Sequence, residues 1–253
     1  MDDQGAVTLS VAGKIGTIEF SHPKSNSLPG AILNKLAETI EQAANNSDVK
    51  VIVLKSAGEK AFCAGASFDE LLAIDNLEQG KEFFSGFAKV INACRKCPKF
   101  IIGRVQGKAV GGGVGMASAV DYCLATEAAF VKLSELAIGI GPFVVGPAVE
   151  RKMGTAAFTQ LAIDATTWKS AEWAESKGLF SELFPDISSL DKAVSNLAET
   201  LAQSSPQAME ELKRISWEGT NGWDELLMKR AEISGALVLS DFTTKAIAKF
   251  KSQ

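Results

Sequence analysis

Short apolar segments alternate with longer amphipathic ones over the first half of the chain. Residues 51–54 and 100–105 are short, largely apolar runs that predict buried strands. Residues 31–44 place their apolar side chains on one helical face, and residues 78–97 also predict a helix. Strands that alternate with helices in this way are typical of an α/β core.

The two ends of the chain follow different patterns. Residues 7–11 and 15–20 flank a short turn and predict a β-hairpin. Beyond about residue 154 the strand signals become rare. Helices are predicted over residues 155–163, 170–177, 190–203, 206–219 and 225–251, the last with a break near residue 240. We therefore expect an α/β core over residues 1–189 and a helical region over residues 190–253.

Charge and composition exclude several classes of protein. The 253 residues include 26 basic and 30 acidic side chains, and the net charge of −4 argues against a nucleic-acid partner. No apolar run approaches the roughly 18 residues of a membrane span, and the polar, acidic start differs from a targeting peptide. We therefore expect a cytoplasmic protein with no membrane partner.

The cysteines and the single histidine limit metal and triad chemistry. Cys94 and Cys97 have the CxxC spacing of zinc ribbons and thioredoxins, but no second CxxC follows. Zinc needs about four ligands, so reduced thiols are the favoured interpretation and no metal is expected. His22 precedes Pro23 in a segment that predicts a turn, which argues against a Ser-His-Asp triad.

Two glycine-containing segments are candidates for binding through backbone N–H groups. Residues 107–115 contain consecutive glycines but match neither GxGxxG nor the P-loop pattern. Tight helix packing is the alternative interpretation. Residues 60–69 follow a predicted strand and contain small side chains. Two such loops could each donate one N–H to a single oxygen, as in an oxyanion hole.

Glu135 is an isolated carboxylate among apolar residues and glycines. Burial in such surroundings raises the pKa of a carboxyl group, which suits proton transfer near neutral pH. A helix-terminal or surface carboxylate is the alternative interpretation.

Taken in order along nearly the whole chain, these segments resemble the crotonase superfamily, the enoyl-CoA hydratases and isomerases. Residues 23–28 are similar to the family's Pro-x-x-Asn-Ala-Leu loop, with Ser27 in place of alanine. Residues 60–69 resemble its AFxAGAD loop, with Ser67 where aspartate is common. Residues 107–115 resemble GxAxGGGxE, and residues 134–139 resemble the (P/S)ExxxG segment. Residues 166–178 are similar to the small-residue helix that follows in the family.

The resemblance implies an α/β fold made of a crotonase-like spiral of ββα turns, with a helical C-terminal trimerisation region. The chain would form a homotrimer or a dimer of trimers. The substrate would be an acyl-CoA thioester, with no cofactor beyond the coenzyme A that is part of it.

The resemblance also implies roles for individual residues. The backbone N–H groups of Ala66 and Gly112 would stabilise a thioester enolate, and Glu135 would be the general acid/base. Ser67, Phe68 and Asp69 would line the acyl-CoA path, while Lys24 and Ala64 would contact the nucleotide portion. Lys249 and Phe250 could reach the coenzyme A bound by a neighbouring subunit.

The sequence departs from the family pattern at Gly115, where typical hydratases have a second glutamate. Hydration needs both an activated water and a delivered proton, whereas moving a double bond needs one base. A single Glu135 therefore favours Δ3–Δ2 enoyl-CoA isomerisation or hydration of an unusual substrate, and Gly115 is expected to leave room for a larger acyl chain. Asp69, Glu70 and Glu150 are possible replacements that no motif supports. A catalytically inactive acyl-CoA-binding homologue is the alternative from another class.

Overall fold

The computed structural model describes residues 5–251, and within them the main sheet has six strands in the order β1-β2-β3-β5-β7-β9. These strands are β1 (Ala6–Ala12), β2 (Ile15–Ser21), β3 (Val51–Ser56), β5 (Ile101–Val105), β7 (Tyr122–Thr126) and β9 (Glu182–Phe184). Strands β1 and β2 form an antiparallel hairpin, and each of the other pairs of neighbouring strands in this sheet is parallel. The predicted hairpin and the predicted strands at 51–54 and 100–105 are confirmed.

A second, smaller sheet joins β4 (Ala61–Cys63), β6 (Lys108–Val110) and β8 (Val131–Lys132) in parallel. Each successive turn of the chain contributes one strand to the main sheet and the next strand to the small one. Helices α2 (Phe68–Ala73) and α3 (Leu77–Lys96) follow β4, and α4 (Gly112–Ala119) follows β6. The short 3₁₀ helix η1 (Glu135–Ile138) follows β8. The predicted spiral of ββα turns is therefore confirmed.

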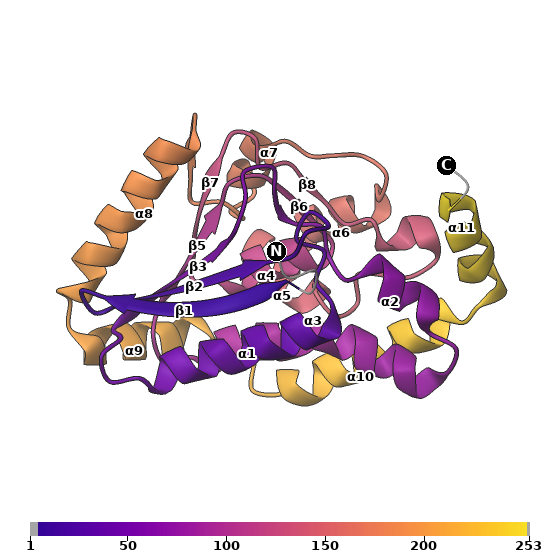
Figure 1. Cartoon of the computed structure of the whole chain (residues 1–253), viewed down its shortest axis with the longest axis horizontal. Coiled ribbons are helices and arrows are strands. Elements are labelled where there is room, and N and C mark those ends of the chain that lie inside the picture. Colours follow the sequence, from indigo (N-terminus) through magenta and orange to yellow (C-terminus); the bar gives the residue numbers. More distant parts are fainter. Residues whose placement is uncertain (1–4, 252–253) are drawn as a thin grey trace.

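Helices cover both sides of the main sheet (Figure 1). On one side lies α1 (Gly30–Asn45), which buries Ile32, Leu33, Leu36 and Ile40 and packs against α3. On the other side lies α8 (Ile187–Ala202), which contacts β3, β5 and β7 through its buried Leu190, Val194 and Ala198. Residues spaced three and four apart give each helix one apolar stripe, so each helix is held by its contact with the core.

The remaining helices complete the C-terminal half. They are α5 (Gly146–Met153), α6 (Thr155–Ile163), α7 (Ala171–Ser176), α9 (Pro206–Ser216), α10 (Trp223–Val238) and α11 (Asp241–Lys251). Helix α10 runs along α3, where Gly80 and Gly235 approach so closely that a β-carbon on Gly80 would lie 2.8 Å from Cα of Gly235. The predicted helices beyond residue 154 are confirmed, including the break before α11. The division of the chain at residue 189 stays a prediction.

The four cysteines are buried free thiols. Burial raises the pKa of the Cys63, Cys94 and Cys123 thiols to about 12. In the described part of the chain, no three His, Cys, Asp or Glu side chains are grouped as metal ligands would be. None of the helices in residues 5–251 has the length and hydropathy needed to cross a membrane.

Candidate active site

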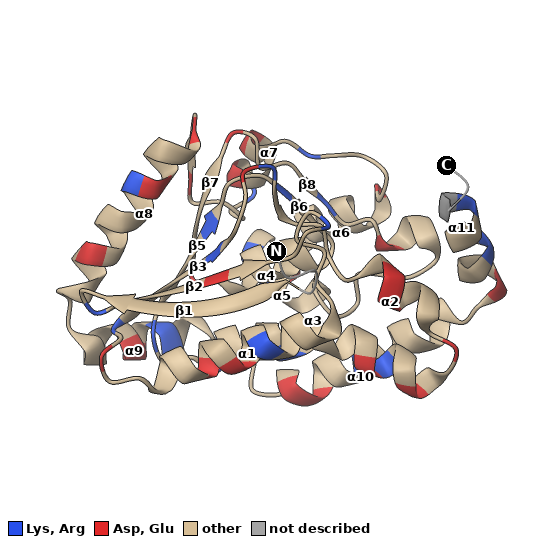
Figure 2. Ribbon diagram, viewed as in Figure 1, with Lys and Arg blue, Asp and Glu red and all other residues tan. Residues whose placement is uncertain are grey.

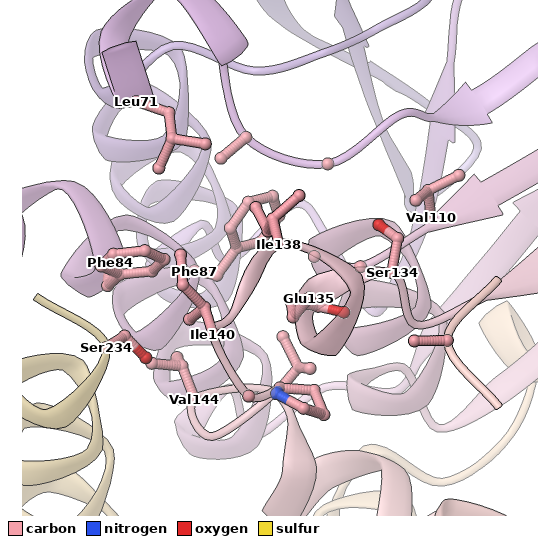
Figure 3. A pocket seen from close by; sticks show the side chains of 18 of the residues that line it. Leu71, Phe84, Phe87, Val110, Ser134, Glu135, Ile138, Ile140, Val144 and Ser234 are labelled. Carbon is pink, nitrogen blue, oxygen red and sulfur yellow. The ribbon is translucent and has the colours of Figure 1, made fainter. Parts of the chain in front are cut away.

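A pocket of about 620 Å³ lies where the loops after β4 and β6 meet η1. Figure 3 shows Glu135 near its middle, with Val110 and Ser134 on one side and Phe84 and Leu71 on the other. The pocket thus has a wall of loops and short strands at one end and a wall of helix side chains at the other.

The first loop of the pocket follows β4 and contains Gly65, Ala66 and Ser67. Leu28 lies beside it, donating its N–H to the carbonyl of Gly65 at 2.7 Å and accepting the N–H of Ser67 at 2.9 Å. Gly65 has a φ of +91°, a conformation that favours glycine. No residue in the described range accepts a hydrogen bond from the N–H of Ala66. That N–H is available to a ligand in the pocket.

The second loop lies between β6 and α4 and touches the first. A β-carbon on Gly65 would lie 3.9 Å from the backbone nitrogen of Gly112, and one on Gly113 would lie 2.5 Å from the carbonyl oxygen of Cys63. Gly112 is the first residue of α4, where backbone N–H groups have no intrahelical partner. The N–H of Gly112 has no hydrogen-bond acceptor among the described residues. The glycines therefore allow two backbone donors from separate loops to line one pocket.

Glu135 is the first residue of η1, and it is the one acidic residue among the described residues that line this pocket. Its carboxylate lies against the second loop, since a β-carbon on Gly111 would be 2.9 Å from Oε1. Its Oε2 is buried without a hydrogen-bond partner among the described residues. Burial raises the pKa of the Glu135 carboxyl to about 7, partly opposed by a hydrogen bond from its own backbone N–H. A group with this pKa can both accept and donate a proton near neutral pH.

The structure brings five of the residues selected from the sequence into this pocket, namely Ala64, Ala66, Phe68, Gly112 and Glu135. The others lie elsewhere. Ser67 is buried as the N-cap of α2, where its hydroxyl accepts the N–H of Glu70 at 3.4 Å. Lys24 and Asp69 form an ion pair with each other on the surface. Lys249 lies on α11, and the side chain of Phe250 lies outside the described residues.

Gly115 does not leave open space in the pocket. It is buried in α4, and a β-carbon there would lie 2.5 Å from Cγ1 of Val145, which itself lines the pocket. The room expected at this position is therefore taken by Val145. Of the possible replacement acids, Glu70 accepts the backbone N–H of Gly30 at 2.8 Å and Glu150 accepts the hydroxyl of Thr155 at 2.8 Å. Neither lines the pocket.

Several pocket residues were not selected from the sequence. Phe83, Phe84 and Phe87 belong to the helix predicted over residues 78–97, whose spacing gives the helix but not the pocket it faces. Lys132 also lines the pocket, at the end of β8. A strand of two residues has too little alternation to show which side chain faces a ligand.

Comparisons with known proteins agree with this geometry. The family model for enoyl-CoA hydratase/isomerase matches residues 11–233. The chain is 29% identical to a short-chain-enoyl-CoA hydratase of Clostridium acetobutylicum, over 80% of this chain and 77% of that one. It is 28% identical to a peroxisomal Δ(3,5)-Δ(2,4)-dienoyl-CoA isomerase of Arabidopsis thaliana, again over 80% and 77%.

A solved structure shares the fold at lower identity. The enoyl-CoA hydratase of Bacillus halodurans superposes with a TM-score of 0.88 at 21% identity, covering 96% of this chain and 99% of that one. The spiral of paired strands, the two touching loops and the match along most of the sequence point the same way. The chain belongs to the enoyl-CoA hydratase/isomerase family, within the crotonase superfamily.

Proposed function

We propose that this protein moves a double bond between the 3,4 and 2,3 positions of an enoyl-CoA thioester, with Glu135 carrying the proton. The observation that carries the proposal is the single acidic side chain among the described residues lining the pocket. Val145 occupies the space over Gly115, so no second carboxylate faces Glu135 from that helix. One base is enough for isomerisation, because the proton that it takes is the proton that it returns.

The proposed reaction begins when the ionised Glu135 removes a proton from C2 of a 3-enoyl thioester. The electrons of that C–H bond form a C1–C2 double bond as the carbonyl π electrons move onto the thioester oxygen, giving a dienolate that keeps the C3–C4 double bond. The N–H groups of Ala66 and Gly112 donate to the enolate oxygen, where one such donor is typically worth roughly 3 kcal/mol of transition-state stabilisation. Protonated Glu135 then delivers its proton to C4, where the C3–C4 π electrons form the new C–H bond. The C1–C2 electrons shift to form the C2–C3 double bond and the carbonyl is restored, leaving the 2-enoyl product.

The helix end of the pocket suits an uncharged acyl chain. Leu71, Phe83, Phe84, Phe87, Ile140 and Val144 line it. None of these side chains can form a hydrogen bond with a polar tail, and the hydroxyl of Ser234 at the same end (Figure 3) already donates to the carbonyl of Arg230 at 3.2 Å. Burying an unpaired charge here would be costly. We therefore infer that the acyl chain extends along this apolar slot while the thioester lies beside Glu135.

Hydration is the second candidate, since one of the relatives above is a hydratase. It would require Glu135 both to activate the water and to supply the proton. The family match does not favour a catalytically inactive binder, and neither does a Glu135 carboxyl whose pKa lies at about 7.

The deciding experiment supplies 2-enoyl-CoA and 3-enoyl-CoA thioesters in deuterated water and follows both by mass spectrometry. Isomerisation predicts their interconversion with no added water, and any deuterium in the product reports exchange of the Glu135 proton with solvent before its return. Hydration instead adds the mass of one heavy water to the 2-enoyl substrate. Glu135→Gln keeps the side-chain shape and should lower turnover by about 100-fold or more. Glu175→Gln changes an exposed glutamate on α7 and is the matched control. Near-normal activity of Glu135→Gln would overturn the assignment.

A further inference from the structure

Two lysines and a tryptophan meet beside the active-site pocket. The ammonium nitrogen of Lys132 lies 4.6 Å from the centre of the Trp168 indole ring, and that of Lys108 lies 5.1 Å from it. Lys132 also lines the pocket. The cluster of these three side chains, called the basic rim below, is therefore continuous with the site of the proposed reaction.

The small sheet holds the basic rim in place. Strands β6 and β8 pair with Val110 opposite Lys132, and alternation along β6 puts Lys108 on the same face as Val110, which lines the pocket. Trp168 precedes Lys169, which exchanges two backbone hydrogen bonds with Val131 at 2.9 and 3.0 Å. Figure 2 shows basic residues on the neighbouring strands β6 and β8. All three side chains thus come from strand residues or from a segment bonded to a strand.

The positive charge of the basic rim is not neutralised within residues 5–251. Neither Lys108 nor Lys132 forms an ion pair with a described acid, while Lys169 in the same segment pairs with Asp164 at 2.6 Å. The indole ring attracts both ammonium groups weakly, and the two like charges repel each other. Trp168 is 36% exposed, so the rim is open to solvent and to a ligand. An anionic group bound here would remove the repulsion.

We propose that Lys108, Lys132 and Trp168 form a subsite for an anionic group of the thioester ligand. The subsite proposal rests on the proposed function for one point, that the ligand is an acyl-CoA. It does not require that the protein isomerises that ligand. Phosphate and carboxylate oxygens share the needed chemistry. The group is a phosphate of the coenzyme if the acyl chain fills the apolar slot, and a carboxylate of the acyl part if that chain turns toward the basic rim instead. Lys24, which the family resemblance assigns to the nucleotide, comes from a different loop and pairs with Asp69.

Equilibrium binding measured by calorimetry separates these two sources without requiring turnover. The ligands are butyryl-CoA, butyryl-pantetheine, glutaryl-CoA and glutaryl-pantetheine. In the double variant Lys108→Ala/Lys132→Ala, a phosphate subsite predicts a Kd raised about tenfold for both CoA thioesters and unchanged for butyryl-pantetheine. A carboxylate subsite predicts the same rise for both glutaryl thioesters and no change for butyryl-CoA.

Two controls keep the test decisive. Lys177→Ala/Lys192→Ala removes the same charge from exposed positions on other elements and should leave every Kd unchanged. Lys108→Gln/Lys132→Gln keeps the side-chain stems over the indole and should reproduce the alanine result. If all four ligands bind the double variant within about twofold of the wild-type Kd, the subsite proposal is overturned. It is also overturned if the wild type binds none of the four ligands. A wild type that binds butyryl-CoA but isomerises no enoyl-CoA would refute the proposed function and leave the subsite standing.

Discussion

At the scale of single residues, Glu135 differs from the other buried charges of this protein. Arg104 is bound by both carboxylate oxygens of Asp191, and Lys213 is bound by Asp121, so those charges are satisfied by protein partners. The Oε2 atom of Glu135 has no such partner in the described structure. An unpaired carboxyl group in an apolar pocket is costly for stability, and it is the arrangement that a proton-transferring group needs.

The raised pKa of Glu135 predicts how the rate depends on pH. The carboxylate must be ionised to remove the C2 proton, so the isomerisation rate should rise with pH and level off above about pH 7. The measurement is kcat/KM for a 3-enoyl-CoA at intervals from about pH 5.5 to about pH 8.5. A flat profile across this range would mean that Glu135 is not the base.

At the scale of elements, the segment before α1 supports the first loop of the pocket. Asn26 is buried, and its amide donates to the carbonyls of Ala57 at 2.9 Å and Ala61 at 3.0 Å while its oxygen accepts the N–H of His22 at 2.8 Å. These bonds fix the position of Leu28, which is hydrogen-bonded to Gly65 and Ser67 on either side of Ala66. The sequence motif therefore marks a support for the proposed oxyanion donor.

Replacing Asn26 should affect both stability and turnover. Asn26→Ala removes three hydrogen bonds and is expected to lower the free energy of unfolding by about 2–3 kcal/mol. It should also lower kcat more than it raises KM, because the N–H of Ala66 is less firmly placed. Urea unfolding and steady-state kinetics measure the two effects. Asn45→Ala, an exposed asparagine near the end of α1, should change neither.

How far the sequence predicted the structure depends on the length of each element. The N-terminal hairpin, strands β3 and β5 and helices as short as the six residues of α7 were predictable, because apolar spacing or flanking cap residues mark them. Strands β4, β8 and β9 have three, two and three residues, too few for a pattern. The candidate site was also predictable only in part. Sequence motifs identified Ala66, Gly112 and Glu135 as candidates. The contact of Val145 with Gly115 joins residues far apart in sequence, which local pattern does not encode.

That contact between α4 and the start of α5 is testable by adding one methyl group. Gly115→Ala should lower the free energy of unfolding by about 1–3 kcal/mol because the new β-carbon meets Val145 in a packed region. Val145→Ala removes the obstructing methyl groups, so the double variant should lose less stability than the sum of the two single changes. Urea unfolding of all four proteins gives this comparison. Strict additivity would show that the two side chains do not compete for the same space.

At the scale of the whole molecule, a buried polar network joins the two regions expected from the sequence. Lys213 on α9 donates to the carboxylate of Asp121 at 2.8 Å and to the carbonyl of Lys99 at 2.8 Å. Trp217 donates its indole N–H to the same carboxylate at 3.0 Å, and so does the backbone of Ile101 at 2.8 Å. Since Asp121 lies just before β7 and Ile101 begins β5, this network links the helical region to the amino-terminal ends of two central strands of the main sheet.

Breaking this network should weaken the whole chain as one cooperative unit. Lys213→Met keeps the side-chain length but leaves Asp121 as a buried carboxylate without its cation, and about 3–5 kcal/mol of stability should be lost. The same shift should appear in tryptophan fluorescence and in far-UV circular dichroism during urea unfolding, because α8 packs on the sheet and α9 is bonded to Asp121 beside it. Adding Asp121→Asn removes the uncompensated charge and should recover part of the loss. Two separate unfolding transitions would instead mean that residues 190–253 fold independently of the core.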